Sequence, residues 1–219
     1  MTFTRHLVAA AVTAALLPMA AQAETFATAT HSLLRGSVAG DMASFYGGTL
    51  FGSYPVALTD AEARAAVLGA PDNTFLSLPG VTGTPSGSPF PGAYVEVSFG
   101  ADFGPNTLLK IWELGDNQES AQIFLWTNNG GNIQFQFTRG ASDINSFDLS
   151  GYAGTLAALG ATSFTKVGIG GLDENGASKG FDLDAVSITA VPEPSTYALM
   201  LAGLGIVGWV GRRRTGVAH

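Results

Sequence analysis

The sequence contains no cysteine among its 219 residues. This absence excludes disulfide bonds, thiol catalysis and zinc sites built on thiolates. A folded domain without such links must be held together by its apolar core, or by an ion bound through oxygen ligands.

Histidine is scarce as well. Of the three histidines, His6 and His219 lie near the chain ends, so a Ser/His/Asp arrangement would have to use His31. The sequence has no phosphate-loop or His-Glu-x-x-His motif. These absences argue against metalloproteases of the His-Glu-x-x-His type and against phosphate-loop nucleotide-binding enzymes.

Basic residues are few in the central part of the chain. Residues 24–190 contain six Lys and Arg against sixteen Asp and Glu, a net charge of −10. Because phosphate binding needs clustered Lys and Arg, we expect no nucleic acid partner.

The first 23 residues have the pattern of an export signal. Arg5 and His6 precede an apolar stretch over 7–17, and Ala21-Gln22-Ala23 is a small-x-small cleavage site. We expect a signal helix over 1–23 that signal peptidase removes.

Short segments with alternating apolar and polar residues dominate 24–190. In 93–99 the residues Ala93, Val95, Val97 and Phe99 share one face, and 132–138 repeats the pattern. The predicted strands are 93–99, 108–114, 121–127, 132–138, 164–172 and 180–189, with Gly- and Asn-rich turns between them. This pattern predicts an all-β domain, an antiparallel β-sandwich of jelly-roll type over 24–190.

One or two short helices accompany the strands. Thr59 and Glu62 form a capping box ahead of an apolar stretch, and Gly69 is the expected end of that helix. A second short helix is expected over 152–159.

The chain ends with an uncharged stretch followed by arginines. Residues 196–211 carry no charged side chain and would span roughly 24 Å as a helix, against a hydrocarbon core of ~30 Å. Four glycines make it a poor soluble helix. Because Arg212, Arg213 and Arg214 follow directly, we expect a membrane helix over 196–211 with the body outside the cytoplasm, and then a short tail, 215–219.

Pro192-Glu193-Pro194, the apolar segment and the arginines together resemble the PEP-CTERM sorting signal of Gram-negative bacteria, over residues 191–214. The resemblance implies export, transient anchoring in the inner membrane, processing by exosortase, and a final location in the cell envelope or the extracellular polysaccharide matrix.

The body resembles secreted jelly-roll domains with a galactose-binding-like fold. The resemblance rests on "AGDMASFYGG", "AAVLGAPDNTFLSLPG", "LLKIWELG" and "GFDLDAVSI" within residues 40–189. It implies carbohydrate binding and a structural calcium ion that an aspartate of the last strand helps to hold.

The last predicted strand places acidic and apolar residues on the same face. If it alternates regularly, Asp182 and Asp184 share a face with Val186 and Ile188, so it either buries a carboxylate or contains a bulge. A buried carboxylate needs a cation or several N–H donors. The nominated calcium ligands are Asp41, Asp72 and Asp184; the alternative is that Asp72 caps a turn and Asp41 is a surface acid.

Two further groups are candidates for sugar chemistry. Glu96 and Glu113 would permit glycoside hydrolysis if they faced each other on neighbouring strands, although two solvated strand acids are the simpler interpretation. Tyr94, on the polar side of its strand, is the candidate surface residue for glycan contact, while Trp112 and Trp126 are expected in the core.

The sequence thus favours an exported, non-catalytic protein that binds polysaccharide. The alternatives are a glycoside hydrolase and a purely structural matrix protein.

Overall fold

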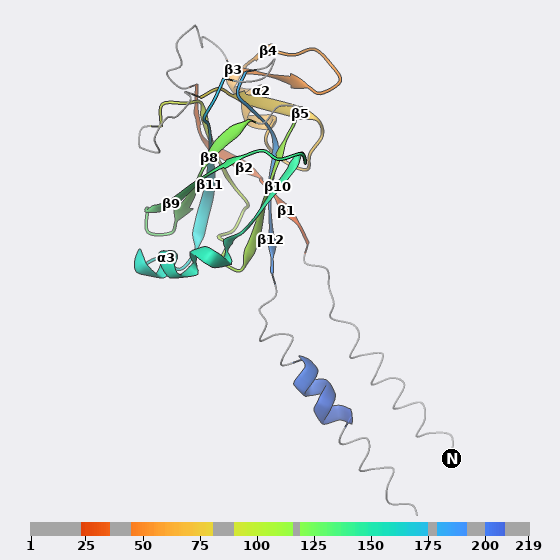
Figure 1. Ribbon diagram of the computed structural model, residues 1–219, viewed down its shortest axis with the longest axis vertical. Coiled ribbons are helices and arrows are strands. Elements are labelled where there is room, and N and C mark those ends of the chain that lie inside the picture. The colour runs from red at the N-terminus through yellow and green to blue at the C-terminus, as the bar shows by residue number, and fades with distance from the viewer. Residues whose placement is uncertain are drawn as a thin grey trace, which may run out of the picture. The chain divides into compact units, whose positions relative to one another are not determined.

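A computed structural model describes residues 23–35, 45–80, 90–115, 119–174, 179–191 and 200–208. The chain divides into two compact units, and one of them comprises Glu24–Ala190. This unit holds all the strands, in two antiparallel sheets (Figure 1). The prediction of an all-β sandwich is confirmed.

The first sheet, called sheet A, has the order β10-β7-β12-β5-β3-β4, with β1 paired to β12. Its strands are β1 (Thr25–Phe26), β3 (Phe45–Thr49), β4 (Val56–Leu58), β5 (Thr74–Leu78), β7 (Thr107–Glu113), β10 (Ile144–Asp148) and β12 (Phe181–Ala190). The sequence patterns missed β1, β3, β4, β5 and β10, and also β2 (Ala29–Leu34) of the second sheet, because these strands are short or lack a clean alternation of apolar and polar residues.

The second sheet, sheet B, has the order β2-β6-β11-β8-β9. Its strands are β2 (Ala29–Leu34), β6 (Tyr94–Ser98), β8 (Ser120–Thr127), β9 (Asn132–Thr138) and β11 (Phe164–Gly171). From β5 to β12 the chain passes repeatedly between the sheets, as in a jelly roll.

The hydrophobic core lies between the two sheets. Sheet B supplies Val95, Val97 and Ile169 to it, and sheet A supplies Leu109 and Ile111, all of them fully buried. The alternation predicted for 93–99 and 132–138 is confirmed, because the apolar set of each segment faces this core. Burial of these side chains is the main force that joins the sheets.

Strand β12 contains a bulge, one of the two features that its sequence predicted as alternatives. Its pairing with β7 shifts between Leu183 and Ala185. The extra residue lets both Leu183 and Val186 face the core, although they are three positions apart. Asp182 and Asp184 alternate with the core residue Leu183 and so lie on the other face of the sheet.

Two short helices lie outside the sheets. Helix α2 (Asp60–Ala65) has the complete capping box of Thr59 and Glu62. It ends at Ala65, four residues before Gly69, so the predicted end of this helix is wrong. The second helix is present as α3 (Ala153–Ala158), preceded by the 3-10 turn η1 (Leu149–Tyr152).

Candidate functional site

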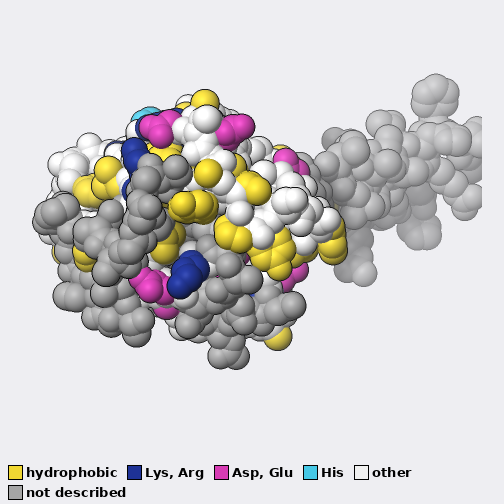
Figure 2. Space-filling model, turned by 90° about the horizontal axis from the view of Figure 1, so that it is seen from above, with side chains coloured by type: hydrophobic (Ala, Val, Ile, Leu, Met, Phe, Trp, Pro, Cys, Tyr) yellow, Lys and Arg dark blue, Asp and Glu magenta, His cyan; other side chains and the backbone are white. Residues whose placement is uncertain are grey.

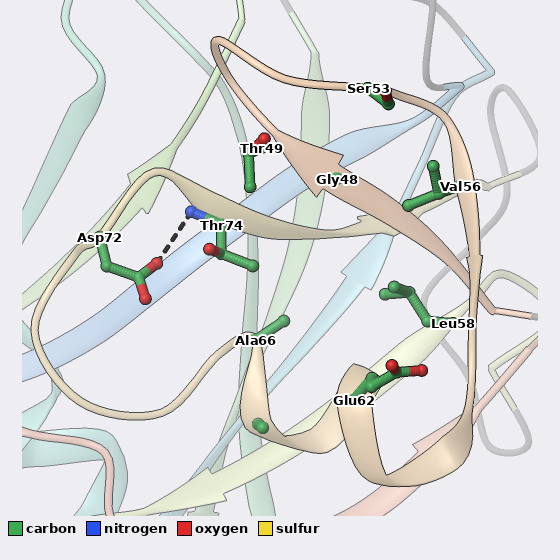
Figure 3. A pocket seen from close by; sticks show the side chains of 10 residues that line it. Gly48, Thr49, Ser53, Val56, Leu58, Glu62, Ala66, Asp72 and Thr74 are labelled. Atoms are coloured by element: carbon green, nitrogen blue, oxygen red, sulfur yellow. Dashed lines mark hydrogen bonds between the residues drawn. The ribbon is translucent and has the colours of Figure 1, made fainter.

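A hollow of about 550 Å³ opens at the edge of sheet A that β3 and β4 form. Its lining comes from the β3–β4 hairpin, helix α2 and the turn before β5 (Figure 3). The lining residues are Gly48, Thr49, Ser53, Val56, Leu58, Glu62, Ala65, Ala66, Asp72 and Thr74. The end of the sandwich that carries β3, β4 and α2 faces the viewer in Figure 2, where hydrophobic side chains lie next to acidic ones.

Local sequence features build the walls of the hollow. At Gly47 a Cβ atom would come within 2.1 Å of the Phe75 carbonyl oxygen, so only glycine lets β3 lie this close to β5. The capping box fixes the start of α2: Glu62 accepts from the Thr59 N–H at 2.8 Å and from its hydroxyl at 2.7 Å. The turn before β5 needs a left-handed residue, and Asn73 adopts that conformation with φ of 69°.

The hollow combines an apolar surface with polar groups. Val56, Leu58 and Ala66 supply aliphatic carbon, and Thr49, Ser53 and Thr74 supply hydroxyl groups. In Figure 3, Thr49 and Thr74 lie on one side of the hollow, and Val56 and Leu58 on the other. Such a site suits a small molecule that has both an apolar face and hydroxyl groups.

Two carboxylates give the hollow its charge. Asp72 accepts the Thr74 N–H at 2.8 Å, and Glu62 is held by Thr59. The backbone N–H of Thr59 lowers the pKa of Glu62, so this group stays ionised at neutral pH. No Lys or Arg is among the ten residues that line the hollow. The charge of these ten residues therefore disfavours anions in the hollow.

Asp184 holds the turn before β5, which forms one wall of the hollow. Its carboxylate is buried and accepts the N–H groups of Asp72 and Asn73, each at 3.2 Å. Burial raises the pKa of Asp184, while these two N–H groups lower it. Of the two ways to stabilise a buried carboxylate, this geometry supplies N–H donors.

Calcium binding stays a prediction. Asp72 and Asp184 are neighbours, as a shared site would require, but their carboxylates already accept backbone N–H groups. The third nominated ligand, Asp41, lies outside the described residues. Within the described part of the chain, no group of three or more acidic or histidine residues is arranged to hold a metal ion.

Tyr94 is buried, with 5% of its surface exposed, so its predicted place on the surface is wrong. Its hydroxyl donates to Glu96 at 3.0 Å and accepts from the Trp126 indole N–H at 2.8 Å. Glu96 also binds Lys166 at 2.6 Å. The ring of Tyr94 lies over Gly168, where a Cβ atom would come within 2.1 Å of the hydroxyl oxygen. Burial raises the pKa of Tyr94, so the hydroxyl stays protonated.

Glu96 and Glu113 do not face each other on neighbouring strands. Strand β6, which carries Glu96, belongs to sheet B, and β7, which carries Glu113, belongs to sheet A. Glu96 is paired with Lys166, and Glu113 is fully buried and paired with Arg139. The hydrolase hypothesis thus loses the geometry on which it was based.

The two tryptophans lie outside the core between the sheets. Trp112 alternates with the core residue Ile111 and packs on Phe26, with a ring-centroid distance of 5.6 Å. Trp126 is partly buried beside Lys166, whose ammonium lies 5.4 Å from the ring centroid. Both belong to the outer faces of the sheets, which period-two alternation alone could have indicated.

The carboxy-terminal segment is described in part. Residues 200–208 are helical, and Leu201 and Ile206 are 65% and 64% exposed. In the described part of the chain, no helix has both the length and the apolar character needed to cross a membrane. Most of the predicted signal segment, residues 1–22, lies outside the described residues, as do Pro192, Glu193, Pro194 and the three arginines.

A comparison with protein families identifies this segment. Residues 190–214 match the PEP-CTERM protein-sorting motif. The predicted sorting signal is thereby confirmed, and the motif marks an exported protein that exosortase processes.

Solved structures similar to the chain include two with carbohydrate-binding modules. One is a truncated AlyQ with CBM32 and alginate lyase domains: TM-score 0.44, 13% identity, covering 78% of this chain and 35% of that chain. The other is BiXyn10A CBM1 in its apo form: TM-score 0.35, 13% identity, covering 77% of this chain and 97% of that chain. The comparison with curated proteins gives no match.

Proposed function

We propose that this protein is an exported, non-catalytic protein that binds polysaccharide through the hollow beside α2. The observation that carries the proposal is the hollow itself, an open site with aliphatic side chains and a polar rim. A sugar ring has an apolar face of C–H groups and a periphery of hydroxyl groups. Aliphatic residues such as Leu58 suit the ring face, and the Asp72 carboxylate suits the hydroxyl groups.

The charge of the hollow narrows the ligand class. Glu62 and Asp72 are acidic and the lining includes no basic residue. A uronic acid or a sulfated sugar would bring its anion against these carboxylates without a compensating cation. Neutral sugars and amino sugars are therefore the favoured ligands.

The state of Glu62 supports a non-catalytic role. Glycoside hydrolysis needs one carboxylic acid that stays protonated near neutral pH. The pKa of Glu62 is lowered, which is the opposite of what a general acid requires. The hollow therefore suits binding better than hydrolysis.

The sorting motif supports the route that the protein takes. In the proposed route signal peptidase removes residues 1–23, the tail holds the protein at the inner membrane, and exosortase then cuts at the tail. The part of this route that a comparison supports is the last step, because residues 190–214 match the sorting motif. The body then works in the cell envelope or the matrix outside the cell. There it meets polysaccharide as its main polymeric partner.

Filling the hollow tests the proposed binding. Ala65 is exposed, lies on α2 and lines the hollow, so Ala65→Trp places an indole in the site. The matched control is Ala157→Trp on the exposed side of α3. On an array of neutral, amino and uronic acid glycans, we expect the full-length chain and the control to bind neutral or amino sugars, and Ala65→Trp to lose this binding. Binding that survives in Ala65→Trp would refute the assignment of the site, and a silent array would favour a purely structural matrix protein.

A further inference from the structure

Four acidic side chains are buried together where β7, β8, β11 and β12 begin or end. Glu113 is fully buried at the end of β7, and Glu119, 2% exposed, directly precedes β8. Asp173, after β11, and Asp182, on β12, are also buried. Burial of several carboxylates at one place is costly unless each one is neutralised or hydrogen-bonded.

Three of the four have uncharged donors, and the donor to Glu119 is the backbone N–H of Asp182. The Ser77 hydroxyl donates to Asp182 at 2.7 Å, and the Ser120 N–H donates to Asp173 at 2.7 Å. Hydrogen bonds of this kind offset the cost of burying a carboxylate. The donors to Asp173 and Asp182 therefore explain why these two side chains can be buried.

Arg139 is the buried cation of this cluster. It directly follows β9 and contacts Glu113, Asp143 and the Gly115 carbonyl oxygen. Its side chain is 6% exposed, whereas that of Asp143 is 60% exposed. One guanidinium thus pairs with both the buried Glu113 and the exposed Asp143. No salt bridge to Glu119 occurs among the described residues.

Glu113 and Glu119 both lie beside Arg139, which contacts the Glu113 carboxylate through its guanidinium and the Glu119 carbonyl oxygen through its backbone N–H, and each carboxyl group affects the ionisation of the other. Two ionised carboxylates contain no hydrogen to share, so a hydrogen bond between them needs a proton on one of them. Oxygen Oε1 of Glu113 and oxygen Oε2 of Glu119 are buried and lack any donor, which a bound proton would partly relieve.

The environment favours this proton. Burial raises the pKa of Glu113, and Arg139 lowers it only in part, while the charge of Glu119 raises it further. Burial also raises the pKa of Glu119, together with the negative charges of Asp182 and Asp173. The pair therefore keeps a proton well above the pH at which an exposed glutamate loses it.

We propose that Glu113 and Glu119 share one proton at neutral pH and form a pH-sensitive clasp between the two sheets. Glu113 belongs to sheet A, whereas Glu119 directly precedes β8 of sheet B. The backbone carbonyl oxygen of Glu119 accepts the backbone N–H of Arg139 at 2.8 Å. Loss of the proton leaves two negative charges in contact beside one guanidinium. The sheets then lose a favourable contact at this edge.

The sign of the pH effect follows from proton counting. An exposed glutamate of the unfolded chain loses its proton at a lower pH than the Glu113–Glu119 pair does in the folded state. Between these two pH values, the folded state holds a proton that the unfolded chain has lost. Stability is therefore greatest at mildly acidic pH and falls as pH rises, and the unfolding equilibrium constant increases about tenfold per pH unit. A carboxylate whose pKa is lowered, such as Glu62, has the opposite effect, since its contribution is lost as pH falls.

Urea unfolding of the full-length chain in mild detergent, from pH 5 to pH 9, tests the clasp. We expect wild type to lose stability as pH rises, and Glu119→Gln, which carries an uncharged amide, to lose most of this dependence. The control Glu174→Gln changes an exposed glutamate near the cluster and should keep the wild-type slope. A wild-type stability that is flat or rises with pH, or an unchanged slope in Glu119→Gln, overturns the proposal.

Infrared spectroscopy of the wild type supplies a test that does not depend on a variant that folds. We expect the absorption of a protonated carboxyl group at pH 7, which disappears at higher pH. Its absence at pH 7 overturns the proposal. So does a pH-dependent stability that a chelator abolishes, because the charge would then be neutralised by a metal ion.

Discussion

At the scale of single residues, Asp184 and Tyr94 are two buried polar side chains whose hydrogen-bond partners explain their burial. Asp184 holds two N–H groups of the turn before β5, and Tyr94 links Trp126 to Glu96. These contacts explain why acidic and aromatic residues on the outer faces of the sheets are buried without belonging to the core.

Replacement of Asp184 should destabilise the protein. Asp184→Ala leaves the N–H groups of Asp72 and Asn73 without their acceptor and should cost about 1–3 kcal/mol. Asp72→Ala, the matched control in the same turn, removes an exposed hydrogen bond to Thr74 and should cost less. Urea unfolding of the two variants measures the difference, and equal losses would contradict this role of Asp184.

At the scale of elements, local signals decide where short segments begin and bend. The capping box places the start of α2 at Asp60. The bulge in β12 lets the core residues of this strand face the core while its aspartates lie on the other face of the sheet. Helix α2 has six residues, too few to be stable alone, so its cap and its packing beside the hollow must act together.

The cap of α2 gives a prediction at this scale. Thr59→Ala removes the side chain that accepts the Glu62 N–H and should cost about 1 kcal/mol, whereas Thr59→Ser retains the hydroxyl and should cost less. Urea unfolding checks the stability. Because α2 lines the hollow, glycan binding should weaken in Thr59→Ala and persist in Thr59→Ser; the same loss in both would contradict a role of the cap.

At the scale of the whole molecule, the two compact units differ in kind. Residues 24–190 contain both sheets and the core, and the other unit contains the terminal segments, including the sorting motif. Among the described residues, the strand pairs that build the sandwich all lie within residues 25–190. We therefore expect the body to fold without either terminus.

Removal of both termini tests this independence. We expect residues 24–190 to fold as a monomeric β-sandwich with a cooperative thermal transition. The predicted calcium ion adds a second measurement: a chelator should lower the melting temperature of this fragment, because an ion that binds only the folded state stabilises it. An unchanged melt would remove the ion site, and a fragment without a cooperative transition would show that the termini contribute to folding.

The sequence by itself determined the local features of the protein. Alternation of apolar and polar residues predicted β6 and β9, the capping box predicted the start of α2, and the spacing of acids in 180–189 required either a buried carboxylate or a bulge, both of which are present. The sorting motif was also readable, because its residues are contiguous.

Only the tertiary structure decided which distant residues meet. Sheet membership separated Glu96 from Glu113. The packing of the two sheets placed Glu119 near Glu113, and it brought the Asp184 carboxylate to the backbone N–H of Asp72. The hollow could not be predicted from the sequence for the same reason. Its walls come from three elements that share no motif beyond the cap at Thr59. Local signals depend on neighbours along the chain, whereas burial and pairing depend on how the two sheets pack.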